Sequence, residues 1–358
     1  MKKNPTIRKL TYPAIDGVRF FAAFVVFIDH LVSLYWTEAL HRTHDQLIER
    51  TWSIWTYLAD GDHGVEIFFV ISGFLMARIV YGREHFSYIG FIGARLKRIY
   101  PALAASVVIG IAARCLLVNW PFQPAQALAN LLLLNTFPEL NIMPYIVVTW
   151  SIGVELMFYL IIPALLLGRR MMGRRVAAIA FSLLATALLW NAGSPYGRMI
   201  GLFAGSVIGA FDDVQLRKLA ARLPLAILVL GYLGCGIAKW LTPMSYDLWR
   251  TIFLPVTMLL FVKIVWGEGN AANRLFSARP IRFLGTISYS FYLLHATVAY
   301  VVVSRFMPAW AETFRFFWYV SATTCLSLAL SYLSYMLIER RYFRGESVSS
   351  SRPGVIVQ

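Results

Sequence analysis

An arginine and a histidine lie eleven residues apart in one apolar segment near the start of the chain. They are Arg19 and His30, and residues 15–30 around them read IDGVRFFAAFVVFIDH. At about 100° per residue, eleven residues bring both side chains to one helix face, about 16 Å apart along the axis. Asp16 precedes Arg19 by three residues and is placed to pair with it. Charges on an apolar helix are costly, so this polar line indicates a functional site.

Three further ionisable residues lie within apolar segments in the layer of His30 nearer the outer face: Glu155 and His295, and Glu66 somewhat closer to the outer surface. One such residue alone is more often a satisfied polar side chain that helps helices associate. Four of them in one layer favour a site, because intramembrane ionisable groups face cavities and one another. A neutral histidine suits general base catalysis, and we expect the Glu155 carboxylate to orient His30.

Asp29 is a second candidate partner for His30 in this catalytic group. It lies about 100° away around the helix, so it serves only if the helix distorts or a neighbouring span approaches. The chain has no Gly-x-Ser-x-Gly elbow around a nucleophilic serine. This favours direct transfer by a base over a covalent serine intermediate.

A pair of arginines, Arg95 and Arg98, begins the third apolar segment and shares one helix face. Such a pair suits a phosphorylated ligand from the cytoplasm, although its charge alone is explained by anchoring at the inner membrane surface. Arg19 strengthens the ligand interpretation, because it lies on the same helix face as His30. The small residues Ser72 and Gly73 permit close approach of a helix or a slim ligand. Glu339 is interpreted as a surface ion-pair residue.

The composition is that of a membrane protein. The chain has 358 residues, of which 59% are hydrophobic and 14% charged, and its mean hydropathy is +0.63. The formal charge of +15 does not indicate nucleic acid binding, since the basic residues lie at segment boundaries. The three cysteines, Cys115, Cys235 and Cys325, all lie in apolar segments, and we expect neither a disulfide nor a metal site.

The apolar segments predict an all-α integral membrane protein, a bundle of about ten transmembrane helices in a lipid bilayer. The sixth segment is short and glycine-rich, and the apolar run at 128–134 is too short to span. The ten segments are 15–35, 63–81, 100–118, 146–168, 175–191, 197–211, 224–241, 247–266, 284–304 and 314–337.

The distribution of Lys and Arg predicts the orientation of the bundle. With both termini in the cytoplasm, most basic residues fall on the inner side, and the outer loop 119–145 has none. We expect one membrane domain over 1–344 and a disordered cytoplasmic tail over 345–358. The absence of an internal repeat weakens a transporter interpretation.

Six motifs in order resemble the membrane-bound acyltransferase-3 family over nearly the whole chain. Each is weak alone, and the ordered set is specific. They are DGVR at 16–19 with His30, GVEIFFVISGF at 64–74, RLKRIYP at 95–101, WSIGVE at 150–155, LGTISYS at 284–290 with His295, and IER at 338–340.

The resemblance implies an enzyme that acylates carbohydrates beyond the cell inner membrane with cytoplasmic acyl-CoA as donor. It implies His30 as catalytic histidine with Arg19 as its paired arginine, Arg95 and Arg98 as donor-binding residues, and Glu155 as the acidic residue. We expect acetyl-CoA as donor, no metal, and a glycan or lipid-linked glycan as acceptor. The donor site is expected to include Ser72, Tyr289 and His295, and the oxyanion stabiliser stays open among Ser72, Tyr289 and Tyr292.

The chain departs from larger family members, which carry a C-terminal hydrolase-like domain, so we expect the membrane bundle to complete transfer alone or with a partner. Two other functions remain open from the residues. One is a transporter or flippase for a lipid-linked glycan, with His30, Glu66 and Glu155 as a proton relay. The other is a non-catalytic partner in a polysaccharide complex, which would tolerate loss of His30 but not packing changes at Gly73.

Overall fold

The structure is a computed structural model that describes residues 12–41, 60–82, 86–242 and 244–341. Every regular element in these ranges is a helix, which confirms the predicted all-α class. The basic residues before position 12 and the predicted tail at 345–358 lie outside the described residues. The orientation of the two termini stays a prediction.

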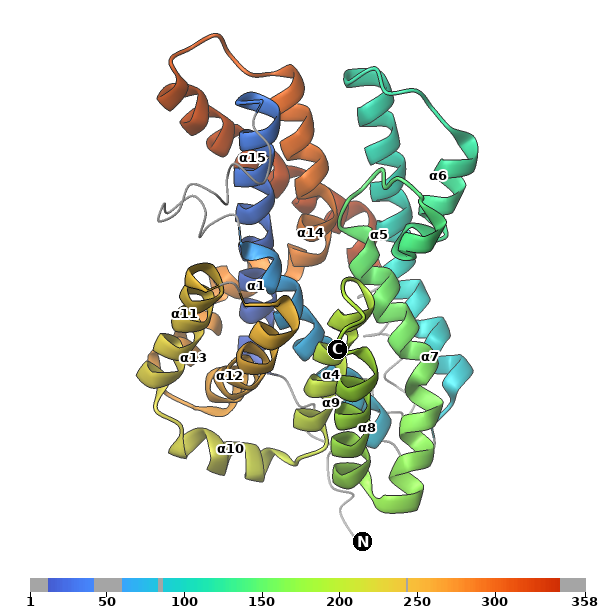
Figure 1. Ribbon diagram of the computed structural model, residues 1–358, viewed down its shortest axis with the longest axis vertical. Coiled ribbons are helices and arrows are strands. Elements are labelled where there is room, and N and C mark those ends of the chain that lie inside the picture. Colours follow the sequence, from blue (N-terminus) through green and yellow to red (C-terminus); the bar gives the residue numbers. More distant parts are fainter. Residues whose placement is uncertain (1–11, 42–59, 83–85, 243, 342–358) are drawn as a thin grey trace, which may run out of the picture.

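Seven helical stretches among the described residues are long and apolar enough to cross a membrane. Two of them continue from an α-helix into a π-helical turn, and one begins with a 3₁₀ turn. Their α-helices are α1 (Pro13–Leu34), α4 (Gly64–Tyr81), α5 (Tyr88–Leu117), α7 (Thr149–Met172), α12 (Tyr246–Trp266), α14 (Arg279–Arg305) and α15 (Glu312–Ser334) (Figure 1).

The predicted number of ten transmembrane helices is not confirmed. All ten apolar segments lie on helices, but three of these helices are shorter than a span: α8 (Arg174–Leu189), α9 (Ile200–Gly209) and α11 (Leu225–Leu241). The stretch containing α9 is followed by α10 (Asp213–Arg222) after a bend of 104°, and counting this bent pair gives eight spans. The run at 128–134 overlaps the end of the short helix α6 (Pro124–Leu131), and α13 (Ala271–Phe276) is also short.

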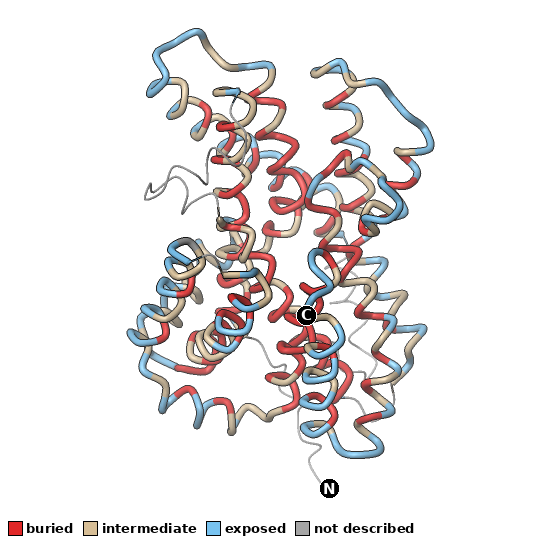
Figure 2. The backbone as a smooth tube through the Cα atoms, viewed as in Figure 1, coloured by how far each residue is buried: buried red, intermediate tan, exposed pale blue. Residues whose placement is uncertain are grey.

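Helix α14 forms the centre of the part of the fold that carries the predicted site. It packs along α1 and also contacts α5 and α15. The α1–α14 contact is close because Gly285 has no side chain: a Cβ atom there would lie 2.2 Å from the backbone oxygen of Asp16. Figure 2 shows α14 and α4 largely buried, whereas α8, α10 and α11 carry much of the exposed surface. Two of the predicted polar segments, those that carry Glu66 and His295, are therefore among the most buried helices.

Helices α4 and α9 form a second close contact, through glycines on both. A Cβ atom at Gly73 would lie 1.9 Å from the backbone oxygen of Leu202, and one at Gly205 would lie 2.1 Å from that of Val70. Because only glycine permits this separation, the small residue at position 73 has the packing role that its sequence context predicts. The glycine-rich sixth segment is thus a buried helix held against α4.

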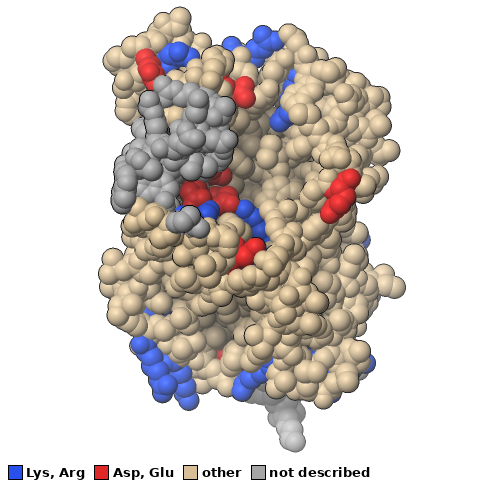
Figure 3. Space-filling view, viewed as in Figure 1, with Lys and Arg blue, Asp and Glu red and all other residues tan. Residues whose placement is uncertain are grey.

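Charge follows the long axis of the molecule. On the face shown in Figure 3, Lys and Arg side chains gather toward the two ends, and the broad middle is mostly uncharged. The exceptions are a group of acidic and basic side chains in a central hollow and a separate acidic patch at the right edge. This distribution matches that of a protein whose middle lies in a bilayer, with cations at the interfaces.

Candidate active site

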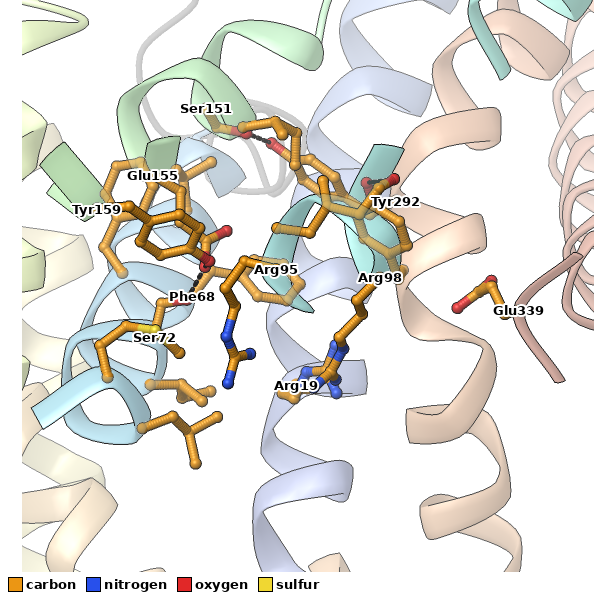
Figure 4. Close-up of a pocket in the computed structure, with 18 of the residues that line it drawn as sticks. Arg19, Phe68, Ser72, Arg95, Arg98, Ser151, Glu155, Tyr159, Tyr292 and Glu339 are labelled. Carbon is orange, nitrogen blue, oxygen red and sulfur yellow. Dashed lines mark hydrogen bonds between the residues drawn. The ribbon is translucent and has the colours of Figure 1, made fainter. Parts of the chain in front are cut away.

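A cavity of about 990 Å³, including the part open to solvent, lies among α1, α4, α5, α7 and α14. We call it the arginine cavity, because three guanidinium groups enter it from two helices (Figure 4). Its polar lining consists of Arg19, Ser72, Arg95, Arg98, Ser151, Glu155, Tyr159, Thr286, Tyr289, Tyr292 and Glu339.

The three arginines predicted to bind the donor meet in this cavity. Arg19 comes from the first turns of α1, and Arg95 and Arg98 come from the first turns of α5. The guanidinium carbon of Arg95 lies 5.7 Å from the centre of the Phe91 ring, which supports it from one side. Three cations around one cavity are suited to a ligand with several negative charges.

Two carboxylates line the same cavity, and each accepts hydrogen bonds from hydroxyl groups. Glu155 accepts from the Ser72 hydroxyl and, at 2.6 Å, from that of Tyr159. Glu339 is buried and accepts a hydrogen bond from Ser290. The interpretation of Glu339 as a surface ion-pair residue was therefore wrong, because the π-helical turn at the end of α15 directs it inward.

Two tyrosines of α14 line the arginine cavity one helical turn apart. The Tyr289 hydroxyl donates to the backbone oxygen of Ile99 at 2.9 Å. The Tyr292 and Ser151 hydroxyls share a hydrogen bond of 2.8 Å. The rings of Tyr292 and His295 are 5.9 Å apart, so Tyr292 lies between this cavity and the predicted histidines.

His30 and His295 form a direct pair, with His30 Nδ1 2.8 Å from His295 Nε2. Their rings are stacked, at 5.1 Å between centres. His295 Nδ1 lies 3.0 Å from the backbone oxygen of Phe291, which can only accept, so Nδ1 carries a proton. In the neutral pair His295 Nε2 then accepts from His30 Nδ1, and the lone pair of His30 falls on Nε2.

His30 also lines a second cavity of about 560 Å³, which we call the histidine cavity. Most of its lining comes from the second halves of α1, α5 and α14 and from the loop before α7. Its lining residues are His30, Ser33, Leu34, Thr37, Arg114, Tyr145, Val147, Ala296, Thr297 and Tyr300.

The two cavities lie at opposite ends of three helices that run in the same direction. On α1, Arg19 precedes His30 by eleven residues, and on α5, Arg98 precedes Arg114 by sixteen. On α14 the residues of the arginine cavity likewise precede those of the histidine cavity. Since helices rise about 1.5 Å per residue, the cavities open toward different ends of the bundle. The histidine pair lies between them.

The structure does not bring all of the predicted catalytic residues together. The hydrogen bonds of Glu155 go to Ser72 and Tyr159 of the arginine cavity, so the partner of His30 is His295 and not Glu155. Asp29 is buried beside Gly61, at the start of the α4 span, and its carboxylate accepts a hydrogen bond of 3.5 Å from Ser33 of its own helix rather than from His30.

Glu66 belongs to a third polar group, which the sequence analysis did not identify. It accepts a hydrogen bond of 2.8 Å from Tyr246, and Arg198 lies 4.0 Å away. Arg198 also pairs with Asp62, which lies 3.4 Å from Lys239. The signal for this network was a set of charges at the ends of apolar segments on the predicted outer side. Glu66 is thus separate in its hydrogen bonds from both Glu155 and His30.

Comparison with known proteins agrees with the arrangement of these residues. A family model described as an acyltransferase domain, that of the acyltransferase-3 family, matches residues 12–336. BcsY of Komagataeibacter xylinus, named as a candidate membrane-bound transacylase, is 27% identical over 79% of this chain and 77% of its own. The exopolysaccharide production protein ExoZ of Rhizobium meliloti is 28% identical over 68% of this chain and 78% of its own.

A more distant relative is the peptidoglycan O-acetyltransferase OatA of Listeria monocytogenes, 22% identical over 96% of this chain. The match spans 59% of the length of OatA. No solved structure is significantly similar to the chain. The chain belongs to the acyltransferase-3 family, as its motifs predicted. It is an acyltransferase and a multi-pass membrane protein.

Proposed function

We propose that this protein is an O-acyltransferase of the cell inner membrane. It transfers an acyl group, acetyl in the first instance, from cytoplasmic acyl-CoA to a hydroxyl group of a carbohydrate on the other side of the membrane. The observation that carries the proposal is the placement of the His30–His295 pair between two cavities of different chemistry. The names of ExoZ and OatA support a glycan acceptor.

The arginine cavity is the proposed donor site. CoA carries several phosphate charges, and Arg19, Arg95 and Arg98 supply three cations around one space. Its pantetheine arm would extend past Tyr292 toward the histidine pair, a distance along α1 of about 16 Å between Arg19 and His30. In this proposal the phosphates lie at the cytoplasmic end of α1 and the thioester lies deeper in the bundle.

His30 is the proposed general base, acting through Nε2. The acceptor hydroxyl gives its proton to Nε2 while its oxygen bonds to the thioester carbonyl carbon. The resulting intermediate collapses, the carbon–sulfur bond breaks, and the CoA thiolate leaves and takes the proton from His30. His295 is a positioning residue: its Nε2 accepts from His30 Nδ1 and thereby holds the lone pair on the opposite nitrogen.

Glu155 takes a different role from the one predicted for it. Glu155 accepts hydrogen bonds from Ser72 and Tyr159 in the arginine cavity. We therefore propose that it helps to set the shape and the charge of the donor site. Tyr289 and Tyr292 line this cavity also. Asp29 has no part in the proposed proton transfer, because its carboxylate accepts a hydrogen bond from Ser33 and not from His30.

The proposal is tested with purified protein in lipid nanodiscs and labelled acetyl-CoA. Wild type and His30→Ala are compared for donor binding, loss of thioester and transfer of label to a panel of glycans. We expect both proteins to bind acetyl-CoA and only wild type to consume it at an appreciable rate. If wild type neither binds nor consumes acyl-CoA with any acceptor, the proposed function is wrong.

A further inference from the structure

Arg114 is a buried cation that lines the histidine cavity and that the proposed mechanism does not use. It lies in the last turn of α5 and is 8% exposed. Its guanidinium carbon lies 4.4 Å from the centre of the Trp120 ring and 4.9 Å from that of Tyr300. Two aromatic rings thus hold the planar group beside the cavity to which His30 contributes.

Within the part of the chain that the structure describes, Arg114 forms no ion pair with an acidic residue, and its Nε is buried without a hydrogen-bond acceptor. An arginine that only anchors a helix end extends its charged group into water. Arg114 instead keeps its charge inside, where an unpaired cation is costly.

Arg114 and His30 line the same cavity. An anion that pairs with Arg114 would therefore be part of the molecule on which His30 acts. We propose that the histidine cavity binds an acidic sugar, whose carboxylate pairs with Arg114 while a hydroxyl group lies at His30. This inference rests on the proposed function, since it names the class of acceptor for the same reaction. The guanidinium presents paired N–H donors that match a carboxylate.

Aromatic rings at the cavity fit the same class of ligand. Tyr145 and Tyr300 line it, and the flat faces of such rings cover the apolar faces of sugar rings. Ser33 and Thr37 line it as well and add hydroxyl groups for the ring hydroxyls. The cavity therefore combines one cation, aromatic surface and hydroxyl groups, which is the chemistry of a monoanionic sugar.

Direct binding without donor tests the inference. The probes are cellotetraose and its counterpart in which the terminal C6 hydroxymethyl group is a carboxylate, and the protein is the full chain in nanodiscs. We expect wild type to bind the acidic probe at least about 10-fold more tightly. A hydrogen-bonded charge pair corresponds to about 1.5–3 kcal/mol, or about 10- to 150-fold in affinity.

Arg114→Gln should remove the preference, because it lowers the affinity for the acidic probe and leaves the affinity for the neutral probe unchanged. Arg114→Lys keeps the charge and should retain part of the preference, which covers the case in which the glutamine variant fails to fold. Arg305→Gln is the matched control, because Arg305 is an exposed arginine at the end of α14 that does not line the histidine cavity, although its Nε donates to the backbone oxygen of Leu117 near Arg114. It should bind both probes as wild type does.

Three results would overturn the inference. The first is equal binding of both probes by wild type. The second is an equal loss of binding to both probes in Arg114→Gln, which would make Arg114 a support of the cavity. The third is a dependence on lipid: if phosphatidylglycerol nanodiscs abolish the preference seen in phosphatidylcholine, a lipid phosphate is the anion. Acetyl-CoA binding and transfer, measured on the same samples, separate this outcome from failure of the proposed function. Transfer to neutral sugars without acidic preference leaves the function intact and removes only this inference.

Discussion

His30 Nδ1 and His295 Nε2 lie 2.8 Å apart and join the first long helix to the central one. The hydrogen bond from His295 Nδ1 to the backbone oxygen of Phe291 fixes which nitrogen of each ring carries a proton. As a result, the lone pair of His30 is directed to Nε2, the nitrogen that the proposed reaction uses. The geometry therefore predicts unequal effects of the two histidines.

His30→Ala should lower the rate of acyl transfer by about 10²–10⁴ and leave acyl-CoA binding unchanged, because it removes the base. His295→Phe should lower the rate less, by about 10- to 100-fold, because it loses only the group that orients the base. His295→Gln, whose amide oxygen can accept from His30 Nδ1, should recover part of the loss. Rates and donor affinities are measured on the same nanodisc samples.

Ser288→Ala serves as the control for the histidine variants, since Ser288 is buried on the same helix as His295 and its hydroxyl donates to the backbone oxygen of Gly285. It should transfer acyl groups as wild type does. Unchanged transfer in His295→Phe together with inactive His30→Ala would show that His295 does not orient the base and has no role beyond packing.

The arginine cavity predicts a dependence on the phosphates of the donor. Arg98→Gln should raise the KM for acetyl-CoA by about 10- to 100-fold, because it removes a charge-assisted contact. The same variant should match wild type when acetyl-pantetheine, which lacks the phosphates, is the donor. High salt should weaken the binding of acetyl-CoA more in wild type than in the variant. An equal loss with both donors would contradict phosphate binding and indicate damage to the cavity.

The network at Arg198 predicts a difference in stability between a buried and an exposed ion pair. Arg198 is 7% exposed, pairs with Asp62 and lies 4.0 Å from the fully buried Glu66. Arg198→Met removes the cation that lies beside the buried Glu66 and leaves Asp62 with Lys239 alone, and it should cost about 3–5 kcal/mol of unfolding free energy. Arg217→Met removes a pair with Glu268 whose side chains are 60% and 74% exposed, and it should cost about 1 kcal/mol or less.

Thermal unfolding in detergent measures both arginine variants. A similar, small loss of stability in Arg198→Met and Arg217→Met would contradict the expected difference. It would show that water solvates the charged groups around Arg198. Acyl-CoA binding by any folded Arg198→Met protein should match wild type, since Arg198 does not line the arginine cavity.

Residue spacing along single helices predicted which side chains share a helix face. For the arginines this prediction agrees with the structure. Arg95 and Arg98 lie on one face of α5 and line the same cavity as Arg19. Depth along the helices also placed His30 and His295 correctly relative to each other. These relationships follow from helix geometry and from the cost of burying charge, both of which the sequence contains.

Lateral arrangement was not predictable in the same way. Glu155 has the depth expected of a partner for His30, yet it lies against Ser72 of α4, because depth does not say which helices are neighbours. Arg114 was not identified because an arginine near a helix end has an ordinary explanation as an anchor. Only its burial between Trp120 and Tyr300 distinguishes it.

The contact between α4 and α9 predicts that Gly73→Ala is destabilising. A Cβ atom at this position would lie 1.9 Å from the backbone oxygen of Leu202, and a backbone atom cannot move aside as a flexible side chain can. The two helices must separate, which should cost about 1–3 kcal/mol as overpacking does. Gly93→Ala on α5 is the control, because a Cβ atom there has no neighbour within 4 Å and alanine favours the helix.

Comparison of Gly73→Ala with His30→Ala distinguishes an enzyme from a non-catalytic assembly partner. In an acyltransferase, His30→Ala abolishes transfer in a protein that unfolds at the wild-type temperature, whereas Gly73→Ala lowers the unfolding temperature and lowers transfer only as far as folded protein is lost. An assembly partner would keep its cellular function with His30→Ala and lose it with Gly73→Ala. Polysaccharide acylation and thermal unfolding, measured for both variants, decide between the two, and a fully functional His30→Ala cell would exclude His30 as the base.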